Sequence, residues 1–180
     1  EKIAERLLAT PKENGSFSMG IEGPWGSGKS YTMALLKKEL GDDVISVDYH
    51  PWRYEEDAGL VEAFFVSLSK ALTPYDGSLR RTLIRYSRHI TQSVKLPFWQ
   101  LTFAHGSNSE SLFNKLNHRI RQLHKPVVVF IDDLDRLEEK EIMQVFKIIR
   151  NTANFDNLIF VAAYDFGYLD KVLFGSANKS

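Results

Sequence analysis

The stretch that decides the fold is an octapeptide near the start of the chain, Gly23-Pro24-Trp25-Gly26-Ser27-Gly28-Lys29-Ser30. It matches the pattern G-x-x-x-x-G-K-[ST], whose glycines let backbone N–H groups approach an anion closely. A short apolar run at residues 17–22 precedes it, and residues 29–40 have the spacing of a helix. A strand, a glycine-rich turn and a helix in this order are the context in which the pattern binds phosphate.

The octapeptide predicts a specific task for its last two residues. The Lys29 ammonium is expected to reach the β- and γ-phosphates of a nucleotide, and the Ser30 hydroxyl to bind Mg²⁺. The N-terminal dipole of the following helix attracts the same phosphates. In that helix Tyr31, Leu35 and Leu36 are expected to face the core. The predicted nucleotide-binding residues are Gly23, Pro24, Trp25, Gly26, Ser27, Gly28, Lys29, Ser30 and Tyr31.

Two acids follow a second apolar run, residues 127–131, and are candidates for the metal side of the site. Asp132, at the carboxyl end of this predicted strand, fits the carboxylate that binds Mg²⁺. Asp133 fits the acid that orients the attacking water. Because aspartate is one methylene shorter than the usual glutamate, hydrolysis is expected to be slow or to need a partner. Asp135 is interpreted as a cap for the helix that follows.

Arg136 and Asp165 are further catalytic candidates with open alternatives. The Arg136 guanidinium could act as an arginine finger, in cis or across a subunit interface, or pair with Asp135 or Glu139. Asp165 follows the apolar run at residues 158–162 and could sense the γ-phosphate or position water. The alternative for Asp165 is a cap for a helix that begins at Phe166.

An aromatic segment, Trp52-Arg53-Tyr54-Glu55, follows a predicted strand at residues 44–47. It comes after the carboxyl end of that strand, where ligands of open α/β sheets bind. Packing in the core is the favoured single role for Trp52.

The alternation of apolar runs with helix-period segments predicts an α/β fold with a mostly parallel sheet covered by helices on both faces. Helices are expected at residues 56–72, 78–95 and 139–151. The chain is interpreted as a single domain, residues 1–180, with a helical insertion at about residues 74–124. This is the three-layer α/β/α arrangement of nucleotide-binding domains.

Composition excludes several classes of protein. The 23 Lys and Arg balance 23 Asp and Glu, so nucleic-acid binding is not indicated. Cysteine is absent, which excludes disulfide scaffolds and thiol catalysis and fits a reducing compartment, so a cytoplasmic location is expected. No apolar run is long enough to span a membrane. The basic segment at residues 78–95 is interpreted as a solvated cationic face, the alternative being peripheral membrane contact through residues 78–103.

The octapeptide, the Trp52-Arg53-Tyr54-Glu55 segment and Ile131-Asp132-Asp133-Leu134-Asp135-Arg136 together resemble the KAP family of P-loop NTPases. The resemblance implies an ATPase of the ASCE group, with an extra strand between the Walker A and Walker B strands. It also implies kinship with STAND-like signalling switches that assemble when ATP is bound. Lys29 and Ser30 then bind phosphate and Mg²⁺, Asp132 is the Walker B acid, Asp133 orients water, and Asp165 occupies a sensor position.

The chain departs from the family pattern at its end. Four core strands are expected here where the fold has a fifth, so the last strand and the helical lid are predicted to be missing. The chain is therefore interpreted as part of a longer protein, with ATP and ADP, other domains of that protein and a homo-oligomeric copy as its expected partners.

Three functions remain open from the sequence. The first is an ATPase that uses Mg²⁺-ATP to drive a conformational change or assembly of a larger protein. The second is a nucleotide-dependent switch with negligible turnover, and the third is a small-molecule kinase. GTP is disfavoured because no N-K-x-D segment is present.

Overall fold

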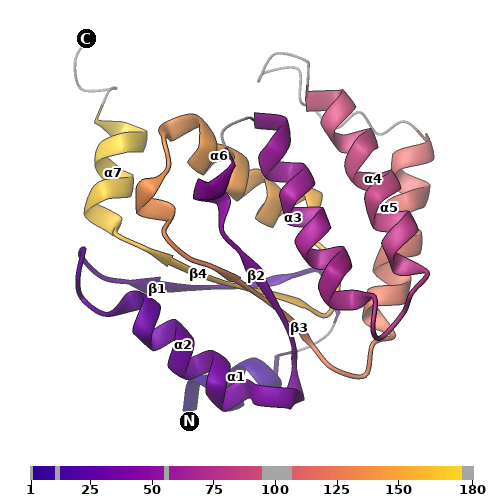
Figure 1. The fold of residues 1–180 in the computed structure, drawn as a ribbon, viewed down its shortest axis with the longest axis horizontal. Helices are drawn as coiled ribbons and strands as arrows, with labels where there is room; N and C mark the ends of the chain where they lie inside the picture. Colours follow the sequence, from indigo (N-terminus) through magenta and orange to yellow (C-terminus); the bar gives the residue numbers. More distant parts are fainter. Residues whose placement is uncertain (1, 11–12, 55–56, 95–106, 176–180) are drawn as a thin grey trace.

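The computed structural model describes residues 2–10, 13–54, 57–94 and 107–175. They form α-helices and β-strands in alternation (Figure 1). The helices are α1 (Lys2–Leu8), α2 (Lys29–Leu40), α3 (Asp57–Leu72), α4 (Leu79–Val94), α5 (Ser107–Arg121), α6 (Glu139–Lys147) and α7 (Phe166–Phe174). The strands are β1 (Phe17–Glu22), β2 (Ile45–Tyr49), β3 (Val127–Ile131) and β4 (Leu158–Tyr164).

The described strands form one parallel sheet in the order β1-β4-β3-β2. Strand β4 pairs with β1 on one side, where Glu22 lies opposite Tyr164, and with β3 on the other, where Ile131 lies opposite Ala162. An extra strand thus lies between the strand that leads into the octapeptide and the strand that leads into Asp132. This arrangement confirms the strand order that the family resemblance implies, and it brings the carboxyl ends of the strands to one edge.

Successive residues of β3 and β4 point to opposite faces of the sheet, and each face is covered by helices (Figure 1). Val128, Phe130, Ile159 and Val161 pack against α1 and α2 on one face. Val127, Val129, Leu158 and Phe160 pack against α3 and α6 on the other. The predicted three-layer α/β/α fold is confirmed.

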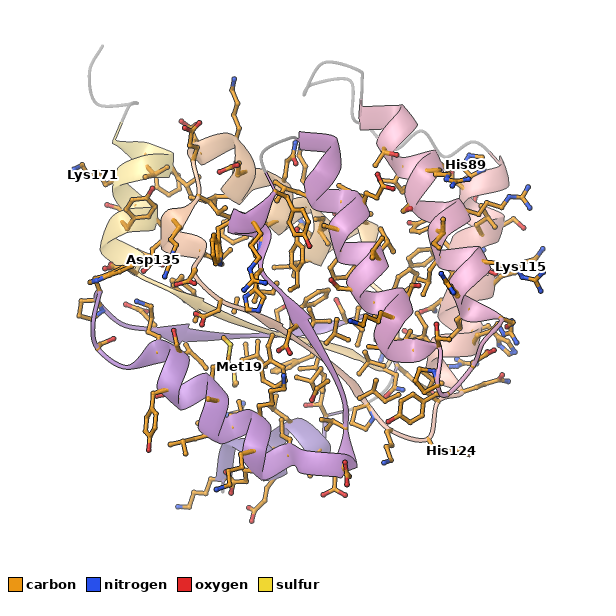
Figure 2. All side chains as sticks on the ribbon, viewed as in Figure 1. Met19, His89, Lys115, His124, Asp135 and Lys171 are labelled. Atoms are coloured by element: carbon orange, nitrogen blue, oxygen red, sulfur yellow. The ribbon has the colours of Figure 1, made fainter. Side chains whose placement is uncertain are left out.

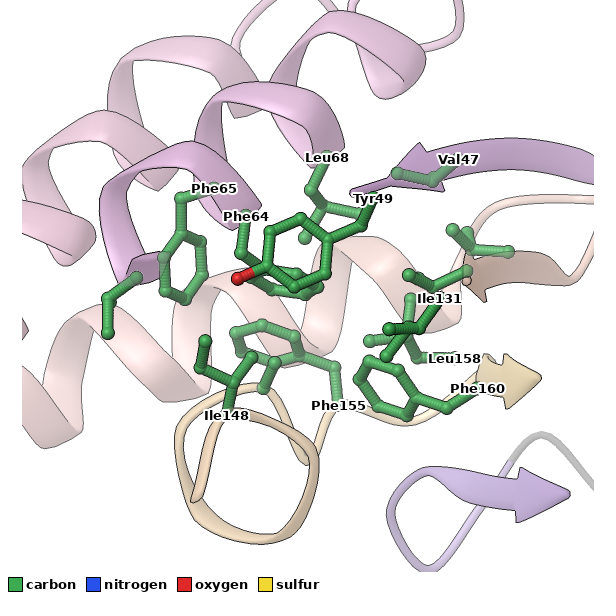
Figure 3. Packing of buried hydrophobic residues seen from close by; sticks show 14 of the residues in the cluster. Val47, Tyr49, Phe64, Phe65, Leu68, Ile131, Ile148, Phe155, Leu158 and Phe160 are labelled. Carbon is green, nitrogen blue, oxygen red and sulfur yellow. The ribbon is translucent and has the colours of Figure 1, made fainter. Parts of the chain in front are cut away.

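The core on the α3 side is rich in aromatic rings (Figure 3). The Tyr49 and Phe64 rings meet edge to face with centroids 5.5 Å apart. The Tyr49 hydroxyl donates a hydrogen bond of 2.9 Å to the Leu60 carbonyl, which joins the end of β2 to α3. Burial raises the pKa of the Tyr49 phenol far above its ordinary value, so this donor stays protonated.

Helices α4 and α5 lie beside α3, on the side of the molecule away from α7 (Figure 1). Leu79, Leu83 and Leu116 are fully buried and belong to the same core as the sheet. The arginines of α4 that the sequence assigned to a solvated cationic face are all exposed: Arg80, Arg81, Arg85 and Arg88. Their exposure agrees with a cationic face, whether it meets solvent or a membrane surface, while Lys95 and the apolar run at residues 96–103 lie outside the described residues.

The prediction that Tyr31 and Leu35 face the core is wrong. Tyr31 is 70% exposed and Leu35 is 48% exposed. The buried stripe of α2 is instead Met33, Leu36 and Leu40, at the spacing of three and four residues that one helix face requires. The expected helix at residues 139–151 also differs, because α6 ends at Lys147 and a π-helical turn, Ile148–Thr152, follows.

In the part of the chain that the structure describes, every helix is too short or too polar to cross a lipid bilayer.

Candidate nucleotide-binding site

The octapeptide forms the turn between β1 and α2. Gly26 and Gly28 have φ values of 79° and 89°, in the left-handed region that residues with a side chain rarely adopt. At the start of the turn the Gly23 N–H donates to the Tyr164 carbonyl of β4 at 3.2 Å. The turn is therefore anchored to the sheet at one end, while its glycines carry the tight curvature before Lys29.

Lys29 is enclosed by acceptors. Its Nζ donates to the Gly23 carbonyl at 2.9 Å and to the Pro24 carbonyl at 3.3 Å, and lies 3.2 Å from Oδ2 of Asp135. The Lys29 and Asp135 side chains are only 9% and 6% exposed. A buried charge requires a partner of opposite sign, and each member of this pair supplies it to the other.

The position of Asp135 corrects its interpretation as a helix cap. Helix α6 is capped by Glu138, which forms a reciprocal capping box with Glu141. Asp135 lies instead in a 3₁₀ turn, Leu134–Arg136, which places its carboxylate against Lys29. In Figure 2 Asp135 lies close to the turn between β1 and α2.

The two acids at the end of β3 have different surroundings. Asp132 uses its Oδ1 to accept a hydrogen bond of 2.9 Å from the Asp133 N–H. Asp133 itself has φ 60° and ψ 38°, a left-handed conformation that aspartate tolerates better than most residues. Its Oδ1 lies 3.0 Å from Nε of Arg136. The alternative in which Arg136 pairs with Asp135 or Glu139 is therefore wrong, since its partner is Asp133.

Arg136 also lies near two tryptophans. Its guanidinium carbon is 5.6 Å from the ring centroid of Trp25 and 5.0 Å from that of Trp52. On Trp52 a second guanidinium, that of Arg53, lies at 5.2 Å. Cation–π contacts of this kind at exposed positions stabilise by about 0.5–1 kcal/mol each.

The favoured role of Trp52 in the core is accordingly wrong. Trp52 is 38% exposed, and Trp25 is 69% exposed. The 3₁₀ turn Pro51–Arg53, which follows β2, brings Trp52 to the same sheet edge as the octapeptide rather than into the core.

These residues surround an open cavity of about 300 Å³, at the lower end of the range for small-ligand sites. It brings together most of the sequence-predicted residues with Asp135, which the sequence interpretation had assigned elsewhere. The lining residues are Trp25, Gly26, Gly28, Lys29, Ser30, Asp133, Asp135 and Arg136.

The other predicted residues do not line this cavity. Gly23 and Pro24 face Lys29 through their carbonyls, and Tyr31 points to solvent. Asp132 remains beside Asp133 at the end of β3. Asp165 follows β4 and caps α7, since its Oδ1 accepts a hydrogen bond of 3.2 Å from the Tyr168 N–H.

The groups near the cavity that could bind a metal ion offer oxygen atoms, the type of ligand that Mg²⁺ prefers. No group of three or more His, Cys, Asp or Glu side chains within the described ranges is arranged to hold a metal ion. Magnesium at phosphate sites needs no such group, because one or two carboxylates, waters and the phosphates themselves complete its shell. Ser30 and Asp132 have the chemistry for that role.

Comparison with known proteins agrees with this geometry. The model of the KAP family P-loop domain matches residues 1–179. The chain is also similar to the Phage T7 exclusion protein of Escherichia coli (strain K12), with 25% identity over 211 aligned positions. That alignment includes 92% of this chain but 28% of the relative, so the chain spans less than a third of the relative's length.

Proposed function

Because the chain belongs to the KAP family of P-loop NTPases, we propose that it binds ATP with Mg²⁺ in the cavity beside Lys29 and hydrolyses it slowly. The observation that carries the proposal is the position of the Lys29 ammonium. It contacts the Gly23 carbonyl and Asp135 beside the N-terminus of α2, and it lines the cavity. A cation fixed next to glycine N–H groups and a helix N-terminus is what phosphate binding requires.

Each residue then has a defined task. Lys29 neutralises the β- and γ-phosphates, and the backbone from Gly23 to Ser30 surrounds them. The Ser30 hydroxyl and the Asp132 carboxylate hold Mg²⁺, which when bound offsets the phosphate charge. Asp165, at the end of the strand between β1 and β3, is proposed to sense the γ-phosphate in addition to capping α7.

Asp133 is the proposed water-orienting acid, and its surroundings bear on the rate. It is short, and it is paired with Arg136 at 3.0 Å. A carboxylate oxygen that already accepts a hydrogen bond from a guanidinium has one lone pair fewer for a water molecule. This supports slow turnover, and it equally favours the second candidate, a nucleotide-dependent switch with negligible hydrolysis.

The proposed output is a conformational change or an assembly step in a longer protein. Strands and helices that end at the cavity would change position when Lys29 exchanges Asp135 for phosphate oxygens. ATP, ADP and further domains of the same protein are the proposed partners.

The site assignment is tested with the Lys29→Ala variant. Calorimetric titration with Mg²⁺-ATP is expected to give binding in the unmodified chain and none in this variant. Lys38→Ala is the matched control, because Lys38 is exposed on the same helix. Tight ATP binding by Lys29→Ala would show that the nucleotide site does not lie beside Lys29.

Single-turnover hydrolysis with Asp133→Asn separates the two candidate functions. In an enzyme the amide cannot accept the water proton, so the rate is expected to fall by about a hundredfold while ATP remains bound. A passive switch would show the same negligible rate before and after the substitution.

A further inference from the structure

The contacts around Arg136 join three segments that are far apart in the sequence. Trp25 belongs to the turn after β1, Trp52 to the turn after β2, and Arg136 to the turn after β3. The guanidinium lies against both rings, and its Nε is paired with Asp133. A long, flexible side chain is thereby held from several directions.

The orientation of this guanidinium matters because Arg136 lines the cavity beside Lys29 and Ser30. Its pairing with Asp133 is made through Nε, so the two terminal Nη nitrogens are not used by that pair. Planar guanidinium groups bind phosphate oxygens through two parallel N–H bonds when their orientation is fixed. The two cation–π contacts and the ion pair with Asp133 together restrict the guanidinium at the cavity wall.

We propose that Trp25 and Trp52 are positioning residues that hold Arg136 in cis to recognise the terminal phosphate, so that the site prefers a nucleoside triphosphate to a diphosphate. The proposal rests on the proposed function, since it assumes that nucleotide phosphates occupy the cavity. Glycine N–H groups and Lys29 bind both nucleotides, whereas only a triphosphate extends to Arg136. Loss of the tryptophan contacts therefore weakens triphosphate binding and leaves diphosphate binding unchanged.

Trp52 is the better residue to alter, because Trp25 lies within the phosphate-binding turn itself. At 38% exposure Trp52 can be shortened without opening the core. Tyr54→Ala is a matched control, since Tyr54 is also 38% exposed and lies in the same segment after β2.

The experiment measures the dissociation constants of Mg²⁺-AMP-PNP and Mg²⁺-ADP for the chain and its variants. Trp52→Ala is expected to reduce the preference for AMP-PNP by about fivefold, with the ADP constant unchanged. Trp52→Phe, which keeps an aromatic face, should restore most of that preference, and Tyr54→Ala should not alter it. Circular dichroism and thermal unfolding establish that each variant is folded.

A double-mutant cycle tests whether Trp52 acts through Arg136. In an Arg136→Ala background, Trp52→Ala is expected to have no further effect on the preference. The positioning role is overturned if the two effects multiply, or if Trp52→Ala leaves the preference intact while Arg136→Ala removes it. If the unmodified chain binds neither nucleotide, the proposed function fails and the positioning role fails with it. If Trp52→Ala binds ADP normally and keeps the full preference for AMP-PNP, the positioning role is wrong while the proposed function stands.

Discussion

Two ion pairs of similar length lie in different parts of the molecule. Lys29 and Asp135 are 3.2 Å apart at the carboxyl ends of β1 and β3, with side chains 9% and 6% exposed. Arg119 and Asp76 are 3.0 Å apart where the turn after α3 meets α5, with side chains 41% and 22% exposed. The distance between two charges therefore does not determine how much their pair stabilises the fold, because water competes for Arg119 and Asp76 and is largely excluded from Lys29 and Asp135.

The environment of each pair matches its place in the fold. Asp76 also accepts hydrogen bonds from the N–H and hydroxyl of Ser78 just before α4, so its carboxylate holds a turn together. Asp135 makes its ion pair with a lysine whose other acceptors are carbonyls of the turn between β1 and α2. The pair of Arg119 and Asp76 stabilises the scaffold, whereas the pair of Lys29 and Asp135 links the stability of the fold to the candidate site.

Removing the acid of the buried pair is expected to have the largest effect. Asp135→Ala leaves Lys29 buried without a counter-charge and should lower the free energy of unfolding by about 3 kcal/mol. Asp76→Ala loses a screened ion pair and the hydrogen bonds to Ser78, at about 1 kcal/mol. Urea denaturation of both variants measures the difference.

An apolar replacement of both buried partners serves as the control for that experiment. The double variant Lys29→Met with Asp135→Leu should recover most of the stability lost by Asp135→Ala, since no charge is left uncompensated. Equal losses for Asp135→Ala and Asp76→Ala would show that burial does not separate the two pairs.

Nucleotide binding should raise the free energy of unfolding, and this gain should depend on Lys29 of the buried pair but not on Asp76 of the exposed pair. At a Mg²⁺-ATP concentration about a hundredfold above the dissociation constant, linkage adds about 2.7 kcal/mol to the free energy of unfolding. The chain and Asp76→Ala are expected to gain this equally, and Lys29→Ala to gain nothing. Thermal unfolding with and without nucleotide measures the gain, and a loss of response in Asp76→Ala would contradict the separation of scaffold from site.

Much of the fold could be predicted from local sequence. The strand Phe17–Glu22 has the limits that the sequence predicts, because the glycine-rich octapeptide that begins at Gly23 ends it. The parallel sheet followed from alternating strands and helices. In α2, however, two apolar sets occur at helical spacing, and the sequence does not say which one meets the sheet. Met33 and Leu40 are buried, while Tyr31 and Leu35 face solvent.

The partners within the site were harder to predict than its members. Lys29, Ser30 and Asp133 were expected near phosphate and do line one cavity. Asp135 was missed because the conformation of the turn Leu134–Arg136 decides whether its carboxylate caps a helix or turns back toward Lys29. Trp52 was missed because an aromatic residue after a strand fits both a core and a cavity rim. Its proximity to Arg136 depends on the pairing of β2 with β3.

The smallest expected effect is the pH dependence of the exposed pair. Burial opposes ionisation of Asp76, but its hydrogen bonds with Ser78 and the charge of Arg119 outweigh that penalty and hold its pKa below the ordinary 3.8. The unfolded carboxyl therefore takes up a proton first as pH falls below about 4, so the contribution of the pair is present at neutral pH and is lost through the pKa of the folded state. Since Arg119 is 41% exposed, solvent limits this contribution to about 0.5 kcal/mol. Urea denaturation between pH 7 and pH 3 should show a steeper loss of stability for the chain than for Asp76→Asn, and parallel curves would mean that the contacts with Ser78 and Arg119 do not lower the pKa of Asp76 in solution.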